Sequence, residues 1–136
     1  MRRVVVTGVG VVAPNGVGRK AFWSACVNGE SGVGPIRSFD TSSLPVHVAG
    51  EVADFDINPY IPSVHRKSLK IMGRASRFGV AAAGLAVQDS GLDLSRENPE
   101  RVGVVLGAGL VPIELPEVAS LVAGALNEDG QFQLDR

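Results

Sequence analysis

Residues 3–16 read Arg-Val-Val-Val-Thr-Gly-Val-Gly-Val-Val-Ala-Pro-Asn-Gly, and this stretch decides which fold class the sequence favours. Its apolar, β-branched residues do not alternate with polar ones. Such a run is typical of a strand buried on both faces, as in a parallel sheet. Pro14-Asn15-Gly16 ends the run. We therefore predict a buried strand over residues 3–12.

A second run, Arg101 to Gly109 (Arg-Val-Gly-Val-Val-Leu-Gly-Ala-Gly), predicts another buried strand that ends in a glycine-rich turn. A short helix is expected over Lys20–Asn28, with Gly29 at its C-terminal cap. The side chains that we expect to face the core from this helix are Phe22, Trp23, Cys26 and Val27.

The longest predicted helix covers Lys67–Ser90, and Gly91 is a good stop signal after it. Its apolar and small residues recur at spacings of three and four, which places them on one face. Because 80–86 is small nearly all round, this helix should pack tightly inside. The residues of that face are Met72, Ala75, Gly79, Ala82, Ala83 and Ala86.

The segment from Glu30 to Ser63 is expected to be mostly loop, with a short strand within 46–52, and Pro116–Leu126 to form another helix. The order of strand, helix, long loop, helix and strand predicts an α/β fold. Two buried strands need helices on both faces and neighbours at their edges. The chain supplies too few of either, so the predicted fold is incomplete.

Composition excludes several classes of protein. The 136 residues suffice for one domain, and a net charge of -1 does not favour nucleic-acid binding. The single cysteine cannot form an internal disulfide, which makes the cytoplasm the expected location. The apolar run after Arg2-Arg3 is too short and broken for a signal peptide, and no segment is long enough to span a bilayer.

Gly8-x-Gly10-x-x-Ala13 after a predicted strand matches a dinucleotide-binding pattern. That function needs a helix to begin at the second glycine, so that its amide groups meet a pyrophosphate. Here Val11-Val12 continue the strand and Pro14 follows. We therefore favour glycines that allow another backbone to approach closely, and keep dinucleotide binding as the alternative.

No catalytic or metal-binding residue is expected in the chain. Cys26 lies among apolar residues inside a predicted helix, which favours a small buried side chain over a nucleophile. His47 and His65 are far apart in a proline-rich segment and lack the spacing of a metal site. We expect no cofactor and no metal.

A basic cluster opens the long predicted helix. It consists of Arg66, Lys67, Lys70, Arg74 and Arg77. Four of these are three or four residues apart, so one helix would present them as one stripe. Such a run is usually a solvated face, and the functional alternative is a docking site for an acidic partner.

Together these segments resemble the chain-elongating β-ketoacyl-acyl-carrier-protein synthases, which are condensing enzymes of the thiolase superfamily. No single motif is diagnostic, but their order over roughly residues 2–110 is specific. The resemblance is carried by residues 3–16, by Phe22-Trp23 through Val33, by Ile36 to Thr41, by Arg66-Lys67 with Met72, by Ala81-Ala82-Ala83, by Gln88 to Leu92 and by Arg101 to Gly109.

The resemblance implies the N-terminal part of a layered αβαβα thiolase-like fold in a homodimeric enzyme. Such enzymes transfer an acyl chain to a cysteine and condense it with malonyl-acyl carrier protein, while two histidines stabilise the developing negative charge. In the family these three residues lie downstream of everything present here. No catalytic residue can therefore be carried over, and we expect the chain alone to be inactive.

Two other roles transfer with the resemblance. Arg66, Lys67 and Lys70 align with a region that docks the acidic acyl carrier protein in relatives. Leu110 resembles a position where relatives place an apolar side chain that lines the acyl pocket.

The sequence also departs from the family pattern. Relatives carry more basic residues and an aspartate within 69–74, and 111–136 diverges from them. The resemblance is therefore to a divergent branch, in fatty acid or polyketide synthesis, and a non-catalytic interaction homologue is a further alternative. We also expect the isolated chain to be unstable or to associate, because its strands lack partners.

Overall fold

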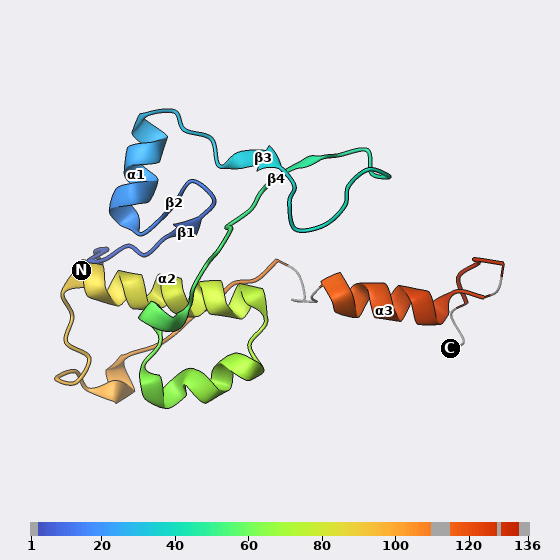
Figure 1. The fold of residues 1–136 in the computed structure, drawn as a ribbon. Helices are drawn as coiled ribbons and strands as arrows, with labels where there is room; N and C mark the ends of the chain where they lie inside the picture. Colours follow the sequence, from blue (N-terminus) through green and yellow to red (C-terminus); the bar gives the residue numbers. More distant parts are fainter. Residues whose placement is uncertain (1–2, 110–114, 128, 134–136) are drawn as a thin grey trace.

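The structure is a computed structural model that describes residues 3–109, 115–127 and 129–133, and Figure 1 shows how its elements are arranged. The α-helices are α1 (Arg19–Val27), α2 (Arg74–Ser90) and α3 (Leu115–Ala125). Three 3₁₀ helices are η1 (Asn58–Tyr60), η2 (Ser63–Lys70) and η3 (Pro99–Arg101). The strands are β1 (Val12–Ala13), β2 (Gly16–Val17), β3 (Val33–Pro35) and β4 (Val48–Gly50).

The described strands form two small antiparallel hairpins. In the first, β1 pairs with β2 across Pro14-Asn15, and in the second β3 pairs with β4. The short strand expected within 46–52 is therefore confirmed as β4, whereas β3 lies in a segment that was expected to be loop. Mixed helix and strand confirm the α/β fold class, in an incomplete form.

The two predicted buried strands do not form in this chain. Of residues 3–12 only Val12 belongs to a strand, and residues 102–109 belong to none. Val4 is 92% exposed and Val105 is 99% exposed. A strand exists only where a neighbour accepts and donates its backbone hydrogen bonds. Among the described residues, the only strand pairing in these two segments is that of Val12 with Val17 in the first hairpin. Their β-branched composition alone cannot replace that neighbour.

The helix α1 lies one residue from its predicted position, and Gly29 after it adopts the left-handed conformation (φ 69°). The prediction of its core-facing side chains is largely wrong. Ala25 is buried, whereas Trp23 is 67% exposed and Cys26 and Val27 are also exposed. The described contacts of α1 are mainly with the small hairpin strand β2, so only one narrow side of the helix is covered.

The long predicted helix is two helices. Residues 71–73 separate η2 from α2, and Gly73 stands at the N-cap of α2 without a side chain to cap it. The predicted stop is confirmed, because Gly91 has φ 69° and ends α2. Burial is one-sided rather than all round: Ala81 is fully buried, whereas Ala83 is exposed.

The N-terminal segment packs against α2 through two glycines. A Cβ atom at Gly10 would lie 1.9 Å from the carbonyl oxygen of Ala82, and one at Gly8 would lie 2.2 Å from that of Ala86. Only a residue without a side chain permits this approach. The predicted close backbone contact and the small residues on this side of α2 are therefore confirmed. Figure 1 shows the blue N-terminal segment beside the yellow end of α2.

A small apolar core lies between η1 and α2. Phe55 stacks on Tyr60 with ring centroids 5.7 Å apart, and meets Phe78 edge to face at 5.1 Å. Ile57 and Ile61 flank η1 in the sequence, and both are buried. The helix α3 lies to one side of these elements in Figure 1, within one residue of its predicted bounds at each end. Its described side chains from 116 to 124 are exposed.

Candidate functional site

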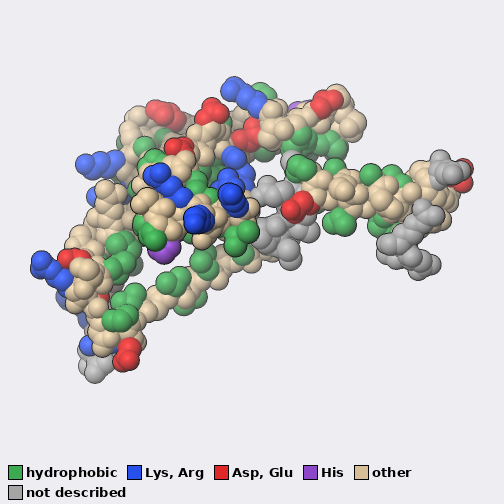
Figure 2. All heavy atoms as spheres, turned by 60° about the horizontal axis from the view of Figure 1, so that its bottom comes forward, with side chains coloured by type: hydrophobic (Ala, Val, Ile, Leu, Met, Phe, Trp, Pro, Cys, Tyr) green, Lys and Arg blue, Asp and Glu red, His purple; other side chains and the backbone are tan. Residues whose placement is uncertain are grey.

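The 3₁₀ helix η2 carries three exposed basic side chains, Arg66, Lys67 and Lys70, which we call the η2 cations. Its sequence, Ser-Val-His-Arg-Lys-Ser-Leu-Lys, contains no acidic residue that could neutralise them. Figure 2 shows Lys and Arg side chains gathered near the middle of the face drawn, over η2 and the first turns of α2. The surface of η2 is therefore a concentrated positive patch, the electrostatic complement of an acidic partner.

The prediction of one basic stripe from Arg66 to Arg77 is wrong, because the helix that would align these residues is interrupted. Arg74 and Arg77 belong to α2, and their side chains bind backbone carbonyl groups of the protein. The guanidinium of Arg74 lies 5.0 Å from the centroid of the Phe78 ring and donates to the carbonyl oxygen of Val52. Arg77 is half-buried and donates to two backbone carbonyl groups.

A hollow of about 400 Å³ adjoins the η2 cations. Cationic side chains, two aromatic rings and one carboxylate line it, and Lys70 belongs both to the hollow and to the patch. The lining residues are Phe55, Lys70, Ile71, Met72, Gly73, Arg74, Arg77, Phe78 and Glu117. The end of η2 is thus recessed on one side.

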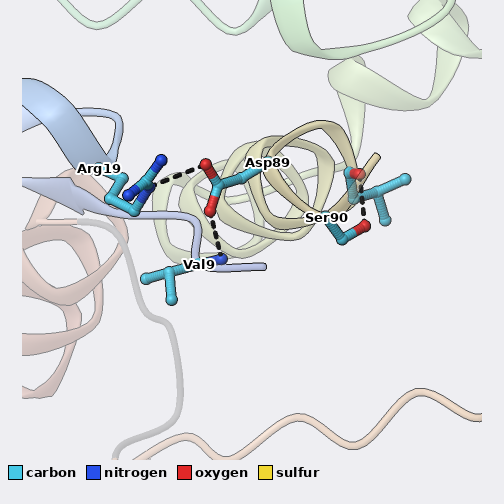
Figure 3. Close-up of polar contacts among 5 residues, drawn as sticks. Val9, Arg19, Asp89 and Ser90 are labelled. Atoms are coloured by element: carbon cyan, nitrogen blue, oxygen red, sulfur yellow. Dashed lines mark hydrogen bonds and ion pairs between the residues drawn. The ribbon is translucent and has the colours of Figure 1, made fainter. Parts of the chain in front are cut away.

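Asp89 ties three parts of the chain together, as Figure 3 shows. One carboxylate oxygen accepts a hydrogen bond from the backbone N–H of Val9 (3.1 Å), and the other pairs with Nε of Arg19 (2.8 Å). The hydrogen bond from Val9, assisted by Arg19, holds the pKa of Asp89 below its ordinary value. No sequence spacing predicts this contact, because Val9 and Asp89 are 80 residues apart.

The cysteine and the two histidines lie in different segments of the described chain. Cys26 is exposed, which corrects the prediction of a buried thiol, and the side-chain amide of Asn15 lies 3.8 Å from its sulfur. Nδ1 of His47 lies 3.2 Å from Oγ1 of Thr41, and His65 is exposed on η2. Within the described part of the chain, no group of three or more His, Cys, Asp or Glu residues could hold a metal ion.

The glycine pattern at residues 8–13 lacks the geometry of a dinucleotide site in the described chain. Gly8 and Gly10 face the backbone of α2, and the next helix, α1, begins only at Arg19. A pyrophosphate needs a helix N-terminus at the second glycine. Leu110, the predicted acyl-pocket residue, lies outside the described residues. Of the helices that are described, none combines the length and the apolar character needed to cross a bilayer.

A family comparison decides how this arrangement is to be understood. The family model described as "Beta-ketoacyl synthase, N-terminal domain" matches residues 1–129. The chain belongs to the β-ketoacyl synthase family. It is 39% identical over 116 residues to "3-oxoacyl-[acyl-carrier-protein] synthase 2" of Vibrio harveyi. The aligned region covers 85% of this chain and 27% of that protein. The resemblance seen in the sequence is therefore confirmed.

Relatives of two kinds share this similarity. The chain is 43% identical over 109 residues to the 3-oxoacyl-[acyl-carrier-protein] synthase 2 of Coxiella burnetii, covering 80% of this chain and 26% of that protein. It is 42% identical over 109 residues to the "Granaticin polyketide putative beta-ketoacyl synthase 1" of Streptomyces violaceoruber, covering 80% of this chain and 25% of that protein. The matched relatives thus include proteins named as 3-oxoacyl-[acyl-carrier-protein] synthases and one named as a polyketide β-ketoacyl synthase.

A solved structure supports the fold. "The ishigamide ketosynthase/chain length factor" matches with a TM-score of 0.60 and 39% identity, over 69% of this chain and 23% of that chain. The chain thus spans about a quarter of the length of the relatives that it matches. The thiolase-like α/β class follows from this match. The matched relatives are much longer than the 136 residues of this sequence.

Proposed function

We propose that this chain acts as part of a β-ketoacyl-acyl-carrier-protein synthase, which condenses an acyl thioester with malonyl-acyl carrier protein. Membership of the family over residues 1–129 supports the reaction class. One matched relative is named a 3-oxoacyl-[acyl-carrier-protein] synthase and another a polyketide β-ketoacyl synthase, which supports a role in fatty acid or polyketide synthesis. The reaction proceeds through a covalent acyl intermediate on a cysteine, with histidines at the developing oxyanion.

The role we propose for this part of the enzyme is carrier-protein docking. The observation that carries it is the exposure of the η2 cations on a helix without any acidic residue. An acidic partner would be steered to such a patch at a rate that falls as salt rises. The Vibrio harveyi relative is named for a 3-oxoacyl group carried on acyl carrier protein. We propose an acyl carrier protein as the acidic partner of this chain.

Three further proposals belong to the complete enzyme. Neither Cys26, His47 nor His65 takes the catalytic role, so the 136-residue chain by itself is inactive. Leu110 lines the acyl pocket, and Leu110→Ala shifts the preferred chain length of the product. The enzyme is a homodimer.

Two measurements test the reaction class. The intact mass of the native protein in its source cell should lie far above 14.1 kDa, the mass of this chain. The purified native protein should then form a β-ketoacyl product from an acyl thioester and malonyl-acyl carrier protein, while the 136-residue chain forms none. A native protein of 14.1 kDa, or product formed by this chain alone, would contradict the proposal.

A further inference from the structure

The helix η2 needs support from outside itself. It is a 3₁₀ helix of eight residues, whereas 3₁₀ runs beyond three or four residues are uncommon because their hydrogen-bond geometry is poor. No side chain caps its N-terminus. The η2 cations lie within five consecutive positions and repel one another, because no acidic residue of the helix lies between them. Local sequence alone therefore favours this helix weakly.

Arg77 supplies support at the end of η2. Its Nη2 donates to the carbonyl oxygen of Leu69, and its Nε donates to that of Met72, both at 3.0 Å. Leu69 lies in the last turn of η2, where carbonyl groups carry negative partial charge. Its carbonyl oxygen also accepts the backbone N–H of Met72 (3.4 Å), so Arg77 adds a charged donor to this carbonyl group. The guanidinium group thus joins η2 and the connection that follows it to α2.

Arg77 is itself held firmly. Its backbone N–H donates to the carbonyl oxygen of Gly73 (3.1 Å) in the first turn of α2, and its side chain is half-buried. Hydrogen bonds from a charged group are stronger than neutral ones, above all where water is partly excluded. By contrast, Arg74 reaches the carbonyl group of Val52, so it connects α2 to a different segment.

We propose that Arg77 is a positioning residue that sets the orientation of η2 relative to α2 and so presents the η2 cations to the carrier protein. This inference rests on the docking role proposed above. Arg77 acts through η2 and does not contact the partner. The planar fork of arginine reaches two carbonyl groups at once, which the single ammonium group of lysine on its shorter stem does not.

The test uses the complete protein with Arg77→Lys, Arg77→Met and the wild type. Arg77→Lys keeps the charge and loses the fork, whereas Arg77→Met loses both and keeps an apolar stem. A third variant, Lys67→Glu plus Lys70→Glu, changes the patch and leaves Arg77 in place. For each protein we would measure amide hydrogen exchange over residues 63–73 and the affinity for the acidic acyl carrier protein at two salt concentrations.

Both Arg77 variants should exchange the amide hydrogens of η2 about tenfold faster and bind the carrier about tenfold more weakly, since losing a hydrogen-bonded charge has effects of this order. The salt dependence of binding should stay close to that of the wild type, because the η2 cations remain. In the double charge reversal, exchange should change little while affinity and salt dependence both fall.

Two results would overturn the role of Arg77. If Arg77→Lys binds like the wild type while Arg77→Met loses both affinity and salt dependence, Arg77 is only another docking charge. If both variants keep wild-type exchange over 63–73, Arg77 does not hold η2. Should Arg77→Met fail to fold, Arg77→Lys alone decides between these results. A wild-type protein that binds no carrier would contradict the docking function itself, and the exchange data would still report on η2.

Discussion

At the scale of single residues, Gly10 has the tightest contact described at any glycine. Replacing it by alanine would place a Cβ atom 1.9 Å from the carbonyl oxygen of Ala82 and 2.5 Å from the backbone nitrogen of Ala86. Both are backbone atoms, so the N-terminal segment must move away from α2. We expect Gly10→Ala to lower the free energy of unfolding of the complete protein by about 1–3 kcal/mol.

Denaturant unfolding would measure this effect. Gly34→Ala is the matched control, because a Cβ atom at Gly34 meets no atom within 4 Å and its φ angle is not positive. Equal stabilities of the two variants would contradict the proposed contact between Gly10 and α2.

Asp89 should make stability depend on pH. Its pKa is held below the ordinary value of 3.8 by the Val9 hydrogen bond and by Arg19, so the ionised form favours the folded state. This contribution is fully present above the unfolded-state pKa, near 4, and is lost as pH falls through the lower folded-state pKa. Asp89→Asn should therefore lower the melting temperature at pH 7, and the deficit should shrink below about pH 4.

Melting temperatures of the wild type and of Asp89→Asn, measured over a series of pH values from neutral to acidic, test this. Glu97→Gln serves as a control for the loss of one exposed carboxylate, since Glu97 makes no hydrogen bond or ion pair with another described residue. A deficit of equal size at every pH would show that the charge of Asp89 does not matter.

At the scale of elements, the end of α2 depends on Gly91. Its φ of 69° is the left-handed conformation, which a Cβ atom disfavours by about 1–2 kcal/mol. Gly91→Ala should lower the free energy of unfolding by about 1 kcal/mol, whereas Gly91→Asn should lose less, because asparagine tolerates this conformation better. Denaturant unfolding of both variants tests the cap, and an alanine variant as stable as the wild type would contradict it.

Helix ends could be predicted from sequence better than helix continuity. Gly29 and Gly91 end α1 and α2 as predicted, because a left-handed residue after a helix is a local requirement. The break between η2 and α2 was missed, although Gly73 stands at the N-cap. Arg77 donates hydrogen bonds across this break to the carbonyl groups of Leu69 and Met72, and these partners are brought together by folding rather than by sequence spacing. The η2 cations could be recognised from the sequence as exposed charges. The backbone contacts of Arg74 and Arg77 could not, because they depend on how separate segments fold together.

At the scale of the whole molecule, the chain exposes apolar segments that resemble core strands in composition. Val4 and Val6 are 92% and 84% exposed, and Val104 and Val105 are 80% and 99% exposed. Exposed, unpaired segments of this kind favour association. We expect the isolated 136-residue chain to self-associate and to melt without a cooperative transition.

Sedimentation velocity and a thermal scan by circular dichroism test this expectation. The chain can be produced as a fusion with a soluble protein, which does not bury these segments. After the fusion partner is cleaved off, the released chain should still self-associate. A soluble monomer with a sharp cooperative melt would contradict it, and would favour a self-sufficient interaction protein.

The sequence predicted the fold class and the family, but not which segments pair in this chain. Residues 3–12 and 101–109 have the composition of buried strands, and composition is a local property. Pairing depends on neighbours, and apart from Val12 at the end of the first segment, no residue of these two segments pairs with another described strand. Small hairpins form instead where a short turn brings residues such as Val12 and Val17 together.

The docking of an acidic carrier protein by the η2 cations is the claim on which the functional account depends. The most direct test is the dissociation constant of the complete protein for acyl carrier protein, in the wild type and in Lys67→Glu plus Lys70→Glu. Lys20→Glu plus Arg101→Glu makes the same charge change on α1 and η3 instead of η2. We predict that the η2 double variant binds at least about tenfold more weakly, because both attractive charges become repulsive, and that the control changes little. Equal losses in the two double variants, or no loss in either, would contradict docking at η2.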